Sequence, residues 1–160
     1  MDDGEVFATV HGPLRRFAAV VRPPDVDVDD LVQEAVTRAL RVGALADLDD
    51  PLVYLRRVVF RLVSNERRSF ARRRDLDDRL GAGAGSAGPR SAVDAYPSDL
   101  ADLVALPPDQ RAVLYLHVVE RASHDEIASM LAITPEASRA RLSRGLKALR
   151  TRLDDQEVTP

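Results

Sequence analysis

Arginine side chains are concentrated in two segments of this sequence, and they suggest a specific chemistry. Residues 56–74 carry a net charge of +7 and residues 134–153 a net charge of +5, although the whole chain of 160 residues carries −3. Nearly all the cations are arginine, because Lys147 is the only lysine. A planar guanidinium group binds phosphate or guanine through two parallel hydrogen bonds. The two basic segments therefore predict contact with nucleic acid.

Residues for catalysis or metal binding are scarce. The chain has no cysteine, which excludes a thiol nucleophile and Cys-ligated metal sites, and its three histidines lack the spacing of metal ligands. Asp29, Asp30 and Glu34 could in principle hold a metal, but helix capping and a Glu34–Arg38 ion pair at four-residue spacing explain them better. We therefore predict no metal, no cofactor and no enzymatic activity.

The elements that position the first basic segment are predicted to be helices over residues 3–21, 28–42 and 51–74. On the third helix, one face is apolar and buried: Leu55, Val58, Val59, Leu62, Val63 and Phe70. The opposite face carries Arg57, Arg61, Arg68 and Arg72. Tyr54, Phe60 and Phe70 could stack on unpaired bases, although core packing is the better interpretation of Phe70. This helix is predicted to bind a nucleic-acid strand.

The second basic segment follows the most specific local signals of the chain. Helices are predicted over residues 98–106 and 109–120, and Ser123 with Glu126 then forms a capping box for a helix that ends near Leu131. Thr134 is a suitable N-cap for the next helix, and Pro135 suits its first position. Two helices joined by so short a turn predict a helix-turn-helix, whose second helix enters the major groove of DNA.

Between the basic segments, glycines are too dense for a helix or a strand. The sequence therefore predicts an all-α protein of two small domains, residues 1–74 and 99–153, joined by a flexible Gly/Ala-rich linker, residues 75–98, and followed by an acidic tail, residues 154–160. No apolar run approaches the roughly 18 residues of a membrane span, and the acidic N-terminus does not resemble an export signal. We expect a cytoplasmic protein.

The order of these motifs resembles the extracytoplasmic-function group of bacterial RNA polymerase sigma factors. Residues 29–34 (DDLVQE) resemble the helix of region 2 that docks on core RNA polymerase, and residues 54–58 (YLRRV) resemble the start of the helix that reads and melts the minus-ten element. Residues 106–114 and 123–128 are similar to region 4, in which residues 134–144 would read the minus-thirty-five element. Ala132 stands where the family usually has a turn glycine.

The resemblance implies three sets of functional residues. Polymerase docking is implied for Asp30, Gln33, Glu34, Thr37 and Arg38. Binding of the downstream promoter element is implied for Tyr54, Arg57, Arg61, Asn65, Arg68 and Arg72. Binding of the upstream element is implied for Pro135, Glu136, Ser138, Arg139, Arg141 and Arg144.

The function implied by the resemblance is promoter-specific transcription initiation, with core RNA polymerase and promoter DNA as partners and an anti-sigma factor as a possible further partner. Two alternatives remain open at this point. One is a free-standing helix-turn-helix regulator that binds its operator without polymerase. The other is an adaptor that occupies polymerase without opening DNA.

Overall fold

A computed structural model describes residues 1–65 and 102–157 of the chain. The N-terminal half, residues 1–65, contains α1 (Asp3–Val21), α2 (Val28–Val42), the 3₁₀ turn η1 (Leu45–Asp47) and α3 (Pro51–Asn65). The C-terminal half, residues 102–157, contains the 3₁₀ turn η3 (Leu103–Ala105), α5 (Pro108–Leu114), the π-helical segment η4 (Tyr115–Val119), α6 (His124–Leu131) and α7 (Pro135–Glu157). The predicted all-α class is confirmed. The predicted linker, and the predicted helix beyond Asn65, lie outside the described residues.

Local capping determines where the first two helices begin. The Asp2 carboxylate accepts a hydrogen bond from the Glu5 amide, and the Glu5 carboxylate accepts one from the Asp2 amide, so a complete capping box opens α1. The Asp27 carboxylate accepts from the amides of Asp29 and Asp30 at the start of α2. These side chains satisfy amide groups that the first turn of a helix leaves without a partner. Both helices have the predicted bounds.

The helix-turn-helix is formed by α6 and α7. The predicted capping box is present, because the Ser123 hydroxyl accepts from the Glu126 amide and the Glu126 carboxylate accepts from the Ser123 amide. Ala132 ends α6 in the left-handed conformation, with φ of 56°. The Thr134 hydroxyl then accepts from the Ala137 amide at 3.0 Å and opens α7. The turn is therefore built as the sequence predicts.

Several local features differ from what the sequence predicts. The helix predicted over residues 109–120 is α-helical only to Leu114 and continues as a π-helical segment. Residues 103–105 form a 3₁₀ turn, not the α-helix predicted there. Helix α7 continues to Glu157, so most of the predicted acidic tail is its last turn. On α2, Leu40 falls at the edge of the apolar side at 100° per residue, and it is 45% exposed.

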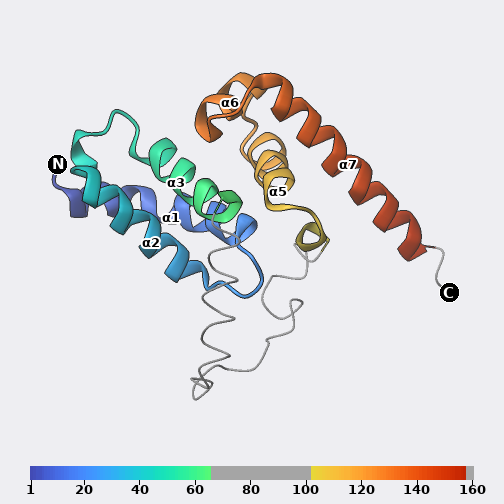
Figure 1. The fold of residues 1–160 in the computed structure, drawn as a ribbon, viewed down its shortest axis with the longest axis horizontal. Coiled ribbons are helices and arrows are strands. Elements are labelled where there is room, and N and C mark those ends of the chain that lie inside the picture. Colours follow the sequence, from blue (N-terminus) through green and yellow to red (C-terminus); the bar gives the residue numbers. More distant parts are fainter. Residues whose placement is uncertain (66–101, 158–160) are drawn as a thin grey trace, which may run out of the picture.

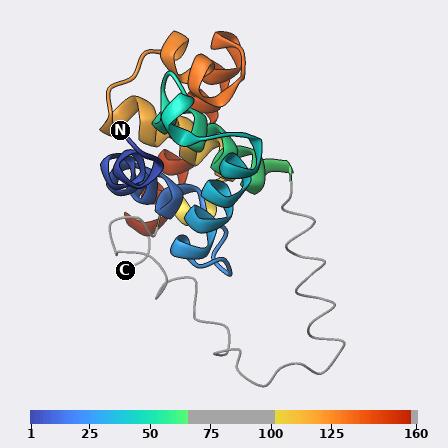
Figure 2. The ribbon, with the colours of Figure 1, turned by 90° about the vertical axis from the view of Figure 1, so that its left-hand side faces the viewer.

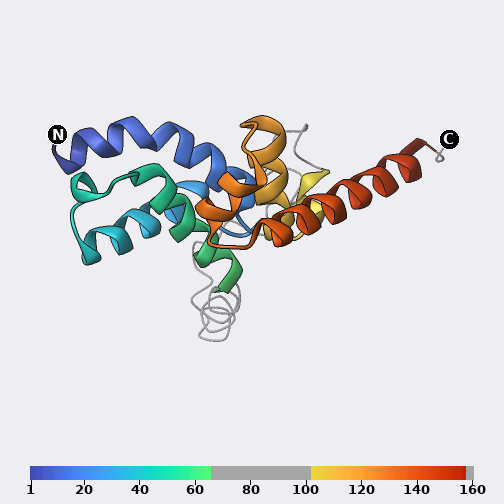
Figure 3. The same ribbon diagram turned by 90° about the horizontal axis from the view of Figure 1, so that it is seen from above.

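The described helices form an elongated body whose two halves are in contact. Helices α1, α2 and α3 lie on one side, α5 packs against α1 and α3, and α6 packs against α3 (Figure 1). Figure 2 shows the same helices from the side of the N-terminus. Helix α7 packs on α5 and α6, and its C-terminal part projects away from the body (Figure 3). The packing on α5 and α6 involves the N-terminal half of this recognition helix, and near its C-terminal end Gln156 donates to the Asp102 carboxylate at 3.1 Å.

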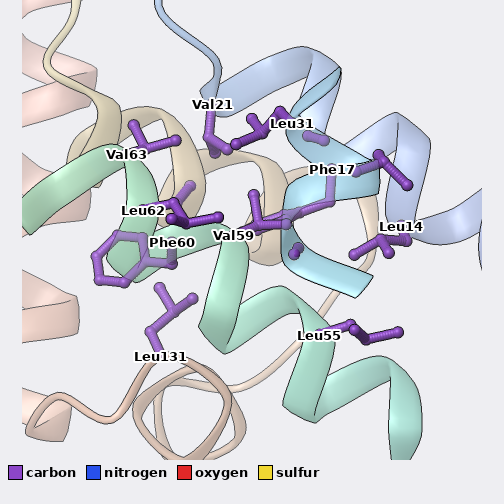
Figure 4. Close-up of a cluster of buried hydrophobic side chains, with 14 of the residues drawn as sticks. Leu14, Phe17, Val21, Leu31, Leu55, Val59, Phe60, Leu62, Val63 and Leu131 are labelled. Carbon is purple, nitrogen blue, oxygen red and sulfur yellow. The ribbon is translucent and has the colours of Figure 1, made fainter. Parts of the chain in front are cut away.

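One hydrophobic cluster extends across both halves. Phe17 of α1 and Val59 of α3 are fully buried in it, and so is Ile127 of α6. Leu131, near the end of α6, lies beside Phe60 of α3 (Figure 4). Burial of a large apolar side chain contributes roughly 1.5–3 kcal/mol. Apolar side chains from both halves therefore stabilise the contact between them.

Candidate nucleic-acid interface

The first turns of α7 present charged side chains to solvent. Glu136 and Arg139 form an exposed ion pair at 3.4 Å, with side chains 77% and 56% exposed. Arg144 is also exposed, and Pro135 is half-buried at the first position of the helix. An exposed ion pair between flexible side chains contributes little to stability, so both groups are available to a partner. This end of α7 has the surface that a groove-binding helix requires.

Ser138 faces the opposite way, into the helix-turn-helix. It is fully buried, and its hydroxyl lies 2.9 Å from Nδ1 of His124 on α6. The His124 ring stacks on His117, with centroids 4.8 Å apart, and His117 Nδ1 donates to the Ala122 carbonyl. Burial lowers the pKa of His124, and the neighbouring His117 and Arg139 lower it further. Ser138 therefore contributes to the packing of α6 on α7.

Arg141 is a partly buried member of the predicted upstream set. Its Nε lies 3.2 Å from the Asp109 carboxylate of α5, and its side chain is 25% exposed. It also lines a hollow of about 420 Å³ between the halves, together with Arg61 and Phe60 of α3. The structure thus brings a residue predicted for the upstream element close to one predicted for the downstream element.

The structure describes α3, the helix predicted to bind a nucleic-acid strand, only as far as Asn65. Arg61 is exposed, Tyr54 is half-buried, and Phe60, which could have stacked on bases, is 6% exposed and belongs to the core. Nothing is described for the Asn65 side chain, and Arg68 and Arg72 lie outside the described residues.

Arg57 of α3 contacts the helix-turn-helix directly. Its Nη2 donates to the Ser129 carbonyl at 2.5 Å, and its Nε donates to the Met130 carbonyl at 3.4 Å. These carbonyls belong to the last turn of α6, where backbone acceptors lack partners within the helix and a cation is favourable. In this arrangement the guanidinium group of Arg57 is occupied by protein.

The predicted polymerase-docking residues lie on α2. Asp30 and Gln33 are exposed, and Thr37 is half-buried. Glu34 and Arg38 form the ion pair expected from their spacing, with Nε to Oε1 at 2.8 Å and both side chains partly exposed. The face of α2 away from the core is therefore polar and accessible.

Among the described residues three arginines are buried, Arg22, Arg56 and Arg111, and none of them had a role predicted from the sequence; two of the three contact the other half of the chain. Arg56 is 4% exposed and forms an ion pair with Glu120, and Arg111 is 3% exposed and donates to the carbonyls of Val20 and Arg22. A signal for Arg56 was present, because at 100° per residue it falls at the edge of the apolar stripe of α3. An arginine at such a position needs a partner from elsewhere in the chain.

Comparison with known proteins places the chain in a family. Residues 103–149 match the family model described as Sigma-70, region 4. The RNA polymerase sigma-E factor of Streptomyces avermitilis is 30% identical to the chain over 162 aligned positions, which cover 96% of this chain and 86% of that protein. The chain belongs to the extracytoplasmic-function group of sigma factors. It is therefore a transcription initiation factor, and the free-standing regulator is not favoured.

The fold of this sigma factor is also similar to a solved one. The sigma factor RpoE of Bartonella quintana, solved in complex with the anti-sigma factor NepR, has a TM-score of 0.60 to this chain, with 17% identity and 98% of each chain covered. At that identity the likeness concerns the fold alone. In residues 1–65 and 102–157 of the sigma factor, no helix is both long and apolar enough to span a membrane.

Proposed function

We propose that this sigma factor docks on core RNA polymerase through α2 and reads two promoter elements, the downstream one with α3 and the upstream one with α7. The observation that carries the proposal is the exposed, charged N-terminal end of α7, the second helix of a helix-turn-helix in which α6 and α7 both begin with a side-chain cap. Glu136, Arg139 and Arg144 are the side chains there that can reach base edges and phosphates.

The remaining predicted roles follow from the same placement. Asp30 and Gln33 are exposed on α2 and available for docking, whereas Arg61 is the exposed arginine of the described part of α3. Ser138 acts by positioning α7, since its hydroxyl is buried against His124. We further propose that the two halves act as separate domains on the polymerase, that the protein works in the cytoplasm without catalysing a reaction, and that an anti-sigma factor controls it.

Transcription from promoter fragments with purified core polymerase tests the upstream assignment. The double variant Arg139→Glu, Arg144→Glu should lose promoter-directed transcripts and protection of the upstream element while still binding core polymerase. Arg150→Glu is the control on the same helix, because Arg150 is exposed about 16 Å farther along the axis than Arg139 and about 9 Å farther than Arg144. Equal loss of transcription in the control, or loss of polymerase binding in the double variant, would contradict the assignment.

The docking assignment is tested separately with the carboxylate of Asp30. Asp30→Asn should weaken binding to core polymerase, whereas Asp47→Asn, which removes an exposed carboxylate from η1, should not.

A footprint with the sigma factor alone tests the free-standing regulator. Full protection of a promoter without polymerase would restore the free-standing regulator.

A further inference from the structure

Ser138, Arg141 and Gly145 lie at successive turns on one face of α7, and this face is packed against the other helices of the C-terminal half. Ser138 contacts α6, and Arg141 is paired with α5. Gly145 is so close to α5 that an added Cβ atom would lie 2.8 Å from a leucine side chain. A helix turns by about 100° per residue, so Arg139 lies about 160° around the helix from Arg141. Arg141 therefore belongs to the packed face, whereas Arg139 is exposed.

The guanidinium group of Arg141 has few donors left for a base pair. Its Nε lies 3.2 Å from the Asp109 carboxylate. Its Nη1 is enclosed by protein and has no hydrogen-bond partner among the described residues. An arginine reads guanine through two parallel hydrogen bonds, which need two accessible nitrogen donors. At most Nη2 remains for DNA, so Arg141 cannot read guanine in this way while it is paired with Asp109.

The pair joins the second turn of α7 to the first turn of α5. Asp109 is the second residue of α5, which begins at Pro108. Both charged side chains are partly enclosed, with 25% of Arg141 and 34% of Asp109 exposed. A charge that is partly withdrawn from water depends on its partner, and a hydrogen bond between charged groups is stronger than one between neutral groups. Loss of the Asp109 carboxylate should therefore free this turn of α7 to move.

We propose that Arg141 is a positioning residue for promoter recognition. Through Asp109 it sets the angle at which α7 enters the major groove, and it does not read a base pair itself. The inference rests on the proposed reading of the upstream element by α7. Glu136 and Arg139, on the exposed face, approach the base edges in the orientation that the Arg141–Asp109 pair holds.

The first test removes the partner of Arg141 and leaves the arginine in place. Footprint titrations of promoter fragments by the sigma factor bound to core polymerase compare Asp109→Ala with Asp125→Ala. Each aspartate is the second residue of its helix, but Asp125 is exposed on α6, so its variant removes the same charge without touching Arg141. Half-protection of the upstream element should need at least about fivefold more of the Asp109→Ala complex than of the Asp125→Ala complex.

The sign of this effect distinguishes positioning from reading. If Arg141 read DNA, removal of Asp109 would release its guanidinium group for that contact and would strengthen binding. Protection by Asp109→Ala that is equal to or tighter than protection by Asp125→Ala would therefore overturn the inference.

The second test keeps Asp109 and changes the arginine. Lysine can still pair with Asp109 as a point charge, but it lacks the planar fork that reads guanine. Arg141→Lys should therefore recover most of the protection that Arg141→Met loses. On fragments that each carry one replaced base pair of the upstream element, both variants should keep the native order of affinities. A loss of discrimination confined to one base pair, in either variant, would show direct reading and would overturn the inference.

A third measurement needs neither polymerase nor DNA. Because the chain has no cysteine, Val118→Cys on η4 and Thr151→Cys on α7, both at exposed positions, introduce two unique sites for spin labels. Pulsed electron paramagnetic resonance should show a broader distance distribution when Asp109→Ala is added, and the same distribution as in the native background when Asp125→Ala is added. An unchanged distribution with Asp109→Ala would overturn the positioning role.

The three measurements separate the inference from the proposed function. If Asp109→Ala fails to fold by circular dichroism, the comparison of Arg141→Lys with Arg141→Met decides the question. Failure of the native chain with polymerase to protect any upstream element would refute the proposed function instead. A broader label distance in Asp109→Ala would then still support the role of the pair in holding α7.

Discussion

Gly145 of α7 offers a sharp test of how the recognition helix is held. It is buried against α5, where an added Cβ atom would lie 2.8 Å from Leu114 Cδ1 and 3.3 Å from Leu114 Cγ. Carbon atoms pack best about 3.5–4.0 Å apart, and Leu114 is itself 4% exposed and enclosed. Gly145→Ala should gain about 1 kcal/mol from helix propensity. Overpacking costs about 1–3 kcal/mol, and a contact this short with an enclosed side chain favours the upper part of that range. We expect a net loss of about 1 kcal/mol.

Urea unfolding followed by circular dichroism measures this loss, and a double-mutant cycle assigns its cause. In a Leu114→Ala background the clash is removed, so Gly145→Ala should then raise the free energy of unfolding by about 1 kcal/mol. The sign of the effect thus reverses between the two backgrounds. An equal stabilisation in both would refute the reasoning, because it would mean that Leu114 moves aside freely and that α7 is not tightly seated on α5.

Three further outcomes follow from other contacts. Ser123→Ala should lower the free energy of unfolding by about 1 kcal/mol through loss of the cap of α6, and Ser123→Asp should not. Folding lowers the pKa of His124 below the ordinary histidine value of about 6.5, so between the two pKa values the unfolded chain binds more protons than the folded chain. The free energy of unfolding should therefore fall as the pH drops through about 6.5, and it should level off below the folded-state pKa. An NMR titration placing the His124 pKa at or above 6.5 would contradict this. Arg111→Met should cost about 2 kcal/mol in urea unfolding, because the carbonyls of Val20 and Arg22 lose a buried donor; an unchanged midpoint would argue against the capping role.

Features that depend on neighbouring residues could be predicted from the sequence. The bounds of α1 and α2 follow from acidic N-caps and from the proline and glycine that end them, and the capping box at Ser123 lies within four residues. The family was also predictable, because several motifs occur in one order. The end of α7 could not be predicted from the sequence. Acidic residues near a helix C-terminus oppose the helix dipole and suggest an earlier end, but they do not prevent helix formation.

Features that depend on distant residues could not be predicted. Arg56 meets a residue 64 positions away, and Arg111 meets one 91 positions away. Periodicity within a helix shows which face is apolar, but it does not show which other helix will cover that face. Leu40 illustrates this limit, since it falls at the edge of the apolar side of α2 and is left exposed. The buried orientation of Ser138 likewise depends on His124 across the turn.

The left-handed turn at Ala132 has a consequence for how this sigma factor could evolve. A residue with a Cβ atom in that conformation is less stable than glycine by roughly 1 kcal/mol, so Ala132→Gly would relieve strain. The same change would widen the range of angles available between α6 and α7, because glycine restricts the backbone least. Selection for a more stable fold and selection for strict promoter discrimination would therefore act on this position in opposite directions.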